Sequence, residues 1–198
     1  MTQIVFVEGI SGVGKTTTTT QLCDKLHSCG YDVQCYIEGA PDNPLDPFNG
    51  AYPPAMPLSS FSETYLKCWQ DFAGNQQKND SIFILDGTLF HHQINDLIRE
   101  YNASDKAIIS HLSALLHVVQ PLNPIVFYLS SNDVGRRLRL ACESRKQSVP
   151  SKDKIAFWEN RKRVDLHALA ALTIESHVFN IDNGWDTAIE TMLKYIAQ

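Results

Sequence analysis

A glycine-rich segment from Gly9 to Thr16, Gly-Ile-Ser-Gly-Val-Gly-Lys-Thr, carries the strongest chemical signal in the sequence. It matches G-x-x-x-x-G-K-[ST], the phosphate-binding loop (P-loop), whose glycines let backbone N–H groups surround phosphate oxygens. The lysine reaches the β- and γ-phosphates, and the hydroxyl after it binds Mg²⁺. An apolar run precedes the segment and a helical pattern follows it, as this loop requires. We therefore predict that a nucleoside triphosphate is bound by Gly9, Ser11, Gly12, Val13, Gly14, Lys15, Thr16 and Thr17.

Two acidic residues end strand-like runs and could complete this chemistry. Asp86 follows Ser81–Leu85, and Glu38 ends the run Tyr31–Glu38. Carboxyl ends of parallel strands meet at one edge of a sheet, where α/β proteins bind their ligands. Asp86 therefore suits a metal-binding role beside Thr16, and Glu38 suits a base that accepts a proton from an attacking hydroxyl. The alternative is that either acid caps a loop or pairs with a lysine.

Arginines are concentrated between residues 136 and 163, a segment that we expect to form a helical lid. Phosphoryl transfer needs cations around the transferred group when the site closes. We predict that Arg139 and Arg145 supply them. The planar guanidinium of Arg136 could instead stack on an adenine ring, and Asn183, after the last strand, is a further candidate for nucleotide binding. The alternative is an ordinary solvated helix face.

A proline-rich loop and an aromatic stripe are the candidates for contacts with a second substrate. Six of the nine prolines fall between residues 41 and 57, so this stretch can be neither helix nor inner strand. Long loops in compact domains often cover a site. The aromatic stripe on the next helix could line a pocket or belong to the core. The predicted substrate-binding residues are Glu38, Asp42, Trp69, Phe72 and His91, with His92 and Asp46 as further candidates.

Strand-like runs alternate with helical patterns along the chain, which predicts a parallel sheet with helices on both faces. Helices are expected at 15–29, 93–101, 105–119 and 133–145, after a capping box at 60–63, from about residue 153, and at the C-terminus. The predicted strands are Gln3–Glu8, Tyr31–Glu38, Ser81–Leu85, Ile125–Leu129 and His177–Ile181. We therefore expect one α/β domain over residues 1–198, a three-layer P-loop NTPase with a five-stranded parallel sheet and a helical lid.

The composition limits the function classes. A net charge of -5 argues against a surface that coats nucleic acid, which would be basic. No stretch is long enough to span a bilayer, and we expect no secretory signal at the N-terminus. The five cysteines form no C-x-x-C pair, so we expect reduced thiols in a cytoplasmic protein without nucleic-acid or membrane partners.

With these motifs, the chain resembles the thymidylate kinase-like group of P-loop kinases, which includes the deoxynucleoside kinases. Glu38-Gly39 stands where those kinases have a Glu-Pro that points to the acceptor. Within the group, the chain looks most similar to a branch of thymidylate kinase-like ATP-binding proteins. The resemblance implies a Rossmann-like core, ATP with Mg²⁺, a cationic lid and an acceptor beneath it. The similar segments are Val7–Gly9, Gly14–Thr17, Gly30–Val33, Tyr36–Gly39, Asn43–Pro44, Trp69–Phe72 and Leu122–Pro124.

Two departures from the group bear on the acceptor. Thymidylate kinases follow the acid of the third strand with an arginine that grips the phosphate of the acceptor, whereas Gly87 follows Asp86 here. Ile37 replaces a second such arginine. The loss of both argues against a nucleoside monophosphate as acceptor.

We therefore predict a kinase that moves the γ-phosphoryl group of ATP to a hydroxyl of a nucleoside, an antibiotic or another specialised metabolite. Two alternatives stay open: a nucleoside monophosphate kinase of the thymidylate kinase type, and a nucleotide-dependent switch that binds a protein partner. Homodimers are common in the group that the chain resembles.

Overall fold

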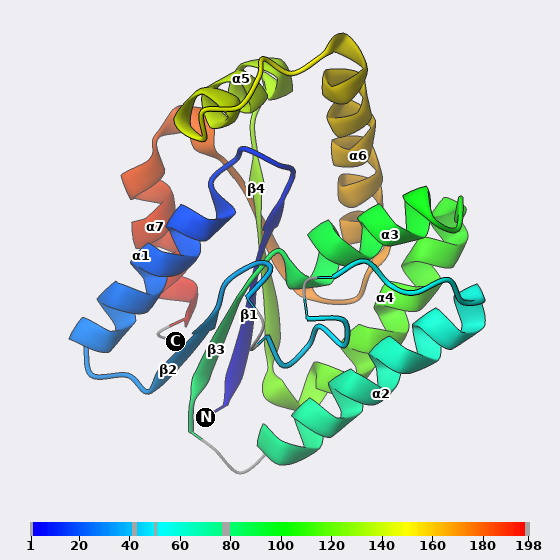
Figure 1. Cartoon of the computed structure of the whole chain (residues 1–198). Helices are drawn as coiled ribbons and strands as arrows, with labels where there is room; N and C mark the ends of the chain where they lie inside the picture. The colour runs from blue at the N-terminus through cyan, green and yellow to red at the C-terminus, as the bar shows by residue number, and fades with distance from the viewer. Residues whose placement is uncertain (1, 41–42, 50, 77–79, 197–198) are drawn as a thin grey trace.

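Five parallel strands form one sheet in the computed structural model, which describes residues 2–40, 43–49, 51–76 and 80–196. The strand order is β2-β3-β1-β4-β5, so the first strand lies in the middle (Figure 1). Within the ladder, Val7 is paired with Asp86 and Gly9 with Leu129, so the ends of β3 and β4 flank the start of the P-loop. The strands are β1 (Gln3–Gly9), β2 (Val33–Tyr36), β3 (Ile82–Asp86), β4 (Pro124–Ser130) and β5 (Glu175–Asn180).

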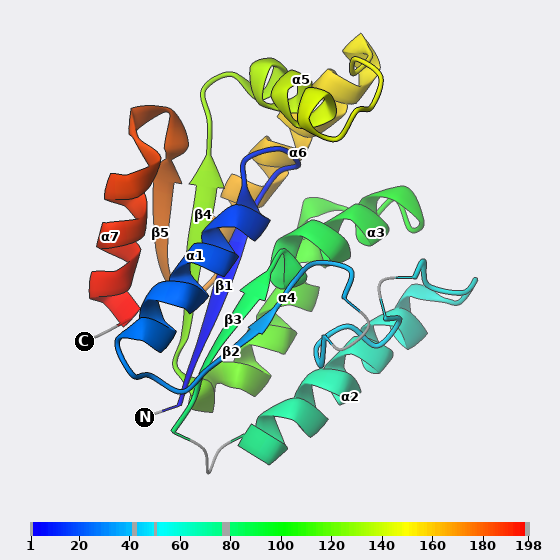
Figure 2. The same ribbon diagram turned by 60° about the vertical axis from the view of Figure 1, so that its left-hand side comes forward.

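Helices cover both faces of the sheet (Figures 1 and 2). One face packs against α1 and α7, and the other against α2, α3, α4 and α6. In Figure 1, α5 and the start of α6 lie above the carboxyl ends of the strands. Among the described residues, no helix combines the length and apolar content needed to cross a bilayer. The α-helices are α1 (Lys15–Ser28), α2 (Leu58–Gln76), α3 (Gln93–Arg99), α4 (Asp105–Val119), α5 (Val134–Ser144), α6 (Lys152–Ala171) and α7 (Trp185–Ile196).

The central strand explains the three-layer arrangement. Successive side chains of a strand point to opposite faces. In β1, Ile4 and Phe6 enter the cluster that α2 and α4 cover, whereas Val5 and Val7 enter the cluster that α1 and α7 cover. All four side chains are buried, as expected for a parallel sheet with two covered faces. The predicted three-layer α/β fold is confirmed.

Several local predictions need correction. The second strand is shorter than predicted and ends at Tyr36, so Glu38 lies in the turn after it. Because α2 begins at Leu58, the segment 60–63 lies inside the helix and is not a capping box. Cys23 on α1 and Cys35 on β2 are joined by a disulfide, so the prediction of five reduced thiols is wrong for this pair.

Candidate active site

The turn between β1 and α1 forms one wall of a cavity of about 120 Å³. This phosphate cavity brings together most of the residues predicted to bind the nucleotide, one predicted lid arginine, and both Glu38 and His91. Val13 lies in the core beneath the loop instead. The lining residues are Ser11, Gly12, Gly14, Lys15, Thr16, Thr17, Glu38, His91 and Arg145.

The loop can take its path only with glycine at its last bend. Gly14 has φ +88°, in the left-handed region that glycine alone visits freely. A Cβ atom there would overlap the ring of Trp185, which packs against the loop at the start of α7. The helix α1 starts at the next residue, Lys15, so its N-terminal N–H groups and positive dipole end face the phosphate cavity.

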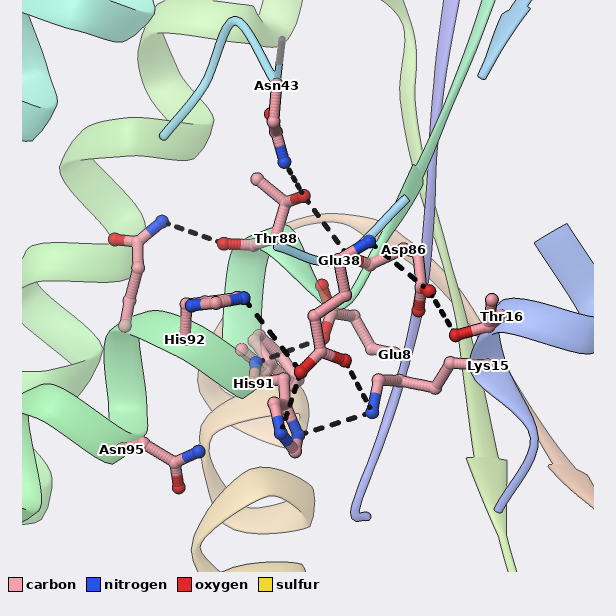
Figure 3. A network of polar contacts seen from close by, with 12 residues as sticks. Glu8, Lys15, Thr16, Glu38, Asn43, Asp86, Thr88, His91, His92 and Asn95 are labelled. Atoms are coloured by element: carbon pink, nitrogen blue, oxygen red, sulfur yellow. Dashed lines mark hydrogen bonds and ion pairs between the residues drawn. The ribbon is translucent and has the colours of Figure 1, made fainter. Parts of the chain in front are cut away.

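Lys15, Glu38 and His91 form a closed triangle of polar contacts (Figure 3). Lys15 Nζ lies 3.3 Å from Glu38 Oε2 and 3.3 Å from His91 Nδ1, and His91 Nε2 lies 3.3 Å from Glu38 Oε1. An ammonium group cannot accept a hydrogen bond, so Nδ1 accepts from Lys15 and the proton on Nε2 is donated to Glu38. Burial lowers the pKa of His91 well below its usual range, and nearby Lys15 adds to this effect. His91 is therefore a neutral imidazole that fixes the Glu38 carboxylate.

Thr16 and Asp86, the predicted metal ligands, are in direct contact. Thr16 Oγ1 donates a hydrogen bond of 2.6 Å to Asp86 Oδ2, and the N–H of Glu38 approaches the same oxygen at 3.4 Å. Asp86 Oδ1 is buried and has no hydrogen-bond partner among the described residues. Burial also raises the pKa of Asp86, and the positive charge of Lys15 and the hydrogen bond from Thr16 oppose that rise. A hydroxyl oxygen and an unpaired carboxylate oxygen fit a Mg²⁺ ion, which binds oxygen ligands.

The segment after Asp86 is irregular and carries His91 into the site. It forms η1 (Thr88–His92), a single turn of π-helix, a rare element that often occurs at functional sites. Gly87 precedes it with φ +64°. A Cβ atom at Gly87 would lie 2.9 Å from Lys15 Cε and 3.1 Å from Glu38 Oε2. Gly87 therefore leaves the room that these two side chains occupy.

A buried acid, Glu8, binds the amino end of η1. Its Oε1 accepts a hydrogen bond of 2.7 Å from the N–H of Leu89, and its Oε2 accepts one of 3.2 Å from the N–H of His91. Burial raises the pKa of Glu8 to about 8, and the positive charge of Lys15 opposes that rise. Glu8 lies at the same edge of the sheet as Glu38 and Asp86. Its side chain is buried, however, and it positions η1.

A buried arginine on α6 binds the carbonyl end of the same turn. Arg161 Nη2 donates to the carbonyl of Phe90 at 2.6 Å, and Nη1 donates to the carbonyl of His91 at 3.3 Å and to Asn95 Oδ1. Its charge is balanced by Asp165, whose Oδ1 lies 2.7 Å from Arg161 Nε. Hydrogen bonds to Glu8 at one end and from Arg161 at the other thus fix the turn that carries His91.

A second cavity, of about 210 Å³, adjoins the phosphate cavity and shares Glu38 and His91 with it. It lies between η1, α3 and the proline-rich loop, which contributes Ala51 and Tyr52. Glu38 faces it together with His92, whose Nε2 lies 3.9 Å from Glu38 Oε1. We call it the acceptor cavity. Its lining residues are Glu38, Ala51, Tyr52, His91, His92, Asn95, Asp96 and Arg99.

The structure corrects the prediction that the aromatic stripe of α2 binds substrate. Trp69 is 0% exposed, stacks on Phe6 and donates its indole N–H to the carbonyl of Leu45 at 3.0 Å. Phe72 is also buried and packs edge-on against Phe83. Both residues belong to the core because that face of α2 covers the sheet.

Other predicted residues lie apart from the two cavities or outside the described residues. Arg136 and Arg139 are exposed on α5, and Asn183 is exposed between β5 and α7; none of the three lines the phosphate cavity. Asp46 is buried and accepts a hydrogen bond from the N–H of Phe48. Asp42 falls outside the described residues.

Comparison with known proteins gives structural similarity only. Neither a protein-family model nor a curated protein matches the sequence. The structure is similar to that of the YorR protein from Bacillus subtilis in complex with phosphorylated GDP, with a TM-score of 0.61 and 10% identity over 98% of this chain and 95% of that one. It is also similar to deoxyadenosine kinase from M. mycoides with bound dATP, with a TM-score of 0.56 and 15% identity over 99% and 100% of the two chains.

This chain has the P-loop kinase fold. The same deoxyadenosine kinase with bound dCTP gives a TM-score of 0.51 at 19% identity, over 98% and 99% of the two chains. Such low identities establish the P-loop kinase fold and nothing finer. Membership of the thymidylate kinase-like group therefore stays a prediction.

Sequence reasoning missed the residues that support the site. The spacing of Arg161 and Asp165, four residues apart on one helix, could have indicated their ion pair. No sequence signal shows that this pair grips η1, because the contact joins segments 70 residues apart. The acceptor-cavity residues on α3 were also missed. In the sequence, Asn95, Asp96 and Arg99 have the pattern of an ordinary polar helix face, and only long-range packing brings them to the cavity.

Proposed function

We propose that this protein is an ATP-dependent kinase that transfers the γ-phosphoryl group to a hydroxyl of a small molecule in the acceptor cavity. One observation carries the proposal: the phosphate and acceptor cavities meet at Glu38 and His91. A hydroxyl bound beside Glu38 in the acceptor cavity would therefore face a phosphoryl group held by the P-loop. This is the arrangement in which positioning and charge stabilisation accelerate transfer.

Each residue at the junction of the two cavities has a separate role in the proposed transfer. The loop N–H groups and Lys15 bind the phosphates of ATP, and Glu38 accepts the proton of the attacking hydroxyl. The hydroxyl oxygen forms a bond to the γ-phosphorus as the bond from that phosphorus to the bridging oxygen breaks, and ADP leaves. Arg145, the lid arginine that lines the phosphate cavity, balances the negative charge of the transferred group.

Thr16 and Asp86 would hold the Mg²⁺ ion that accompanies ATP. Support comes from their direct contact and from the unpaired, buried Asp86 Oδ1. When bound, Mg²⁺ neutralises charge on the β- and γ-phosphates. The chain contributes the fixed direction of Asp86, which the hydroxyl of Thr16 and the N–H of Glu38 maintain.

The test is transfer of one phosphoryl group from ATP to a member of a metabolite and antibiotic panel, detected by the mass gain of the acceptor. Lys15→Ala should abolish transfer while the circular dichroism spectrum is kept, because the P-loop loses its only side-chain ammonium. Glu38→Gln should lower kcat about 10²–10⁴-fold if the carboxylate is the base. The matched control is Lys25→Ala, on the exposed side of the same helix, with wild-type rates. Slow ATP hydrolysis that no small molecule changes would instead support a nucleotide-dependent switch.

A further inference from the structure

Nearly every residue around the acceptor cavity can form hydrogen bonds. Among the eight described residues that line it, Ala51 is the one exception. Asn95 and Arg99 supply N–H donors, whereas the carboxylates of Glu38 and Asp96 supply acceptors. Donors and acceptors therefore face the same small volume, and a matching ligand must carry both kinds of group over most of its surface.

The cavity offers little aromatic surface to a flat ring. Trp158 is buried and stacks on His91, with centroids 5.1 Å apart and planes 10° apart. The ring of Phe157 is covered by the guanidinium of Arg99, 4.8 Å from its centroid. Among the described lining residues, Tyr52 supplies the one ring besides the imidazoles, and its side chain is 74% exposed. Both imidazoles turn a nitrogen toward Glu38, so their edges are engaged there (Figure 3).

The size of the cavity also favours a small ligand without a flat ring system. Its volume of about 210 Å³ is below the range of roughly 300–1,000 Å³ that is usual for pockets of drug-sized ligands. A single ring bearing hydroxyl groups suits such a volume. A ligand that adds a nucleobase to a sugar needs more room and a flat apolar face on which to stack.

We infer that the acceptor is a small polyhydroxylated molecule of the sugar or cyclitol class and carries no nucleobase. This inference rests on the proposed function and narrows its substrate. Each hydroxyl of such a molecule can donate one hydrogen bond and accept two, which matches a wall that carries amide, guanidinium and carboxylate groups. One hydroxyl lies beside Glu38 and is phosphorylated, and Asp96 accepts hydrogen bonds from others.

The first experiment compares two acceptor sets under the same conditions, with ATP, Mg²⁺ and the full chain. One set holds ribose, glucose, gluconate and myo-inositol; the other holds adenosine, deoxyadenosine, thymidine and thymidine monophosphate. We expect a member of the first set to have a higher kcat/KM than every member of the second. A nucleoside or nucleotide with an equal or higher value would overturn the inference and leave the proposed kinase function intact. Absence of product from both sets would overturn both.

The second experiment tests the cavity wall with the acceptor found in the first. Burial raises the pKa of Asp96 to about 6, so the assay is run at pH 8, where its carboxylate is ionised. Asp96→Asn should raise KM for the acceptor at least tenfold and leave KM for ATP unchanged. The matched control is Asp71→Asn, an exposed acid on α2 that pairs with Lys67 outside both cavities, with wild-type values. An unchanged KM for the acceptor in Asp96→Asn would contradict the assignment of the wall.

Discussion

Arg161 should be the most sensitive single residue outside the cavities, and Arg161→Met tests this directly. The side chain of Arg161 is buried and makes four hydrogen bonds through its guanidinium, one of them to Asp165. Methionine has a similar length and no donor groups. The substitution therefore removes the donors to the carbonyls of Phe90 and His91. It leaves Asp165 with the hydrogen bond of 2.9 Å that the hydroxyl of Tyr128 donates.

The expected loss follows from the burial of the pair, since both side chains are at most 1% exposed. Removing one partner of such a pair leaves an uncompensated buried charge and costs about 3–5 kcal/mol of unfolding free energy. The total free energy of unfolding of a domain is about 5–15 kcal/mol, so this loss is a large fraction of it. Burial already raises the pKa of Asp165, and Arg161 opposes that rise, so the variant raises the pKa further. A folded-state pKa above the unfolded value makes the protonated form more stable, so the loss should grow as pH rises from 5 to 8.

Urea unfolding followed by tryptophan fluorescence measures this loss, with the same m-value expected for variant and wild type. The matched control is Arg163→Met on the same helix, where the exposed arginine lies 3.6 Å from Asp105 and contributes less than about 1 kcal/mol. A loss below about 1 kcal/mol for Arg161→Met, or one that is equal at pH 5 and pH 8, would refute the reasoning.

Two further predictions concern the residues on either side of η1. His91→Leu should lower kcat about tenfold, because it removes the hydrogen bond that fixes Glu38. His91→Gln should keep most of the wild-type kcat, because its amide can donate to Glu38 and accept from Lys15. Steady-state kinetics measure both values, and a glutamine variant as slow as the leucine variant would disprove the positioning role. Glu8 has a folded-state pKa of about 8, above its ordinary 4.5, so the stability due to its protonated form is complete below about pH 4.5 and lost as pH rises to about 8. Glu8→Gln should therefore flatten the decline of unfolding free energy between pH 5 and 8, and equal slopes in urea titrations of both proteins would contradict this.

The sequence by itself determined the fold class and predicted the described residues that line the phosphate cavity. The P-loop is a local motif, in which Gly14, Lys15 and Thr16 act through positions fixed by the chain immediately around them. The alternation of strand and helix patterns is also local, so it predicted five parallel strands with helices on both faces. Asp86 and Glu38 were placed near the loop because parallel strands end at one edge of the sheet, a rule that needs no coordinates.

Only the tertiary structure decided which side chains meet beyond that edge. Trp69 and Phe72 show the same helical spacing whether their face covers a core or a ligand, so sequence could not separate the two. The π-helical turn that brings His91 to Lys15 has no sequence signature, and its shape depends on Glu8 and Arg161 from distant segments. The acceptor cavity is likewise assembled from η1, α3 and the proline-rich loop. Local propensity fixes elements, whereas burial and long-range hydrogen bonds fix the site between them.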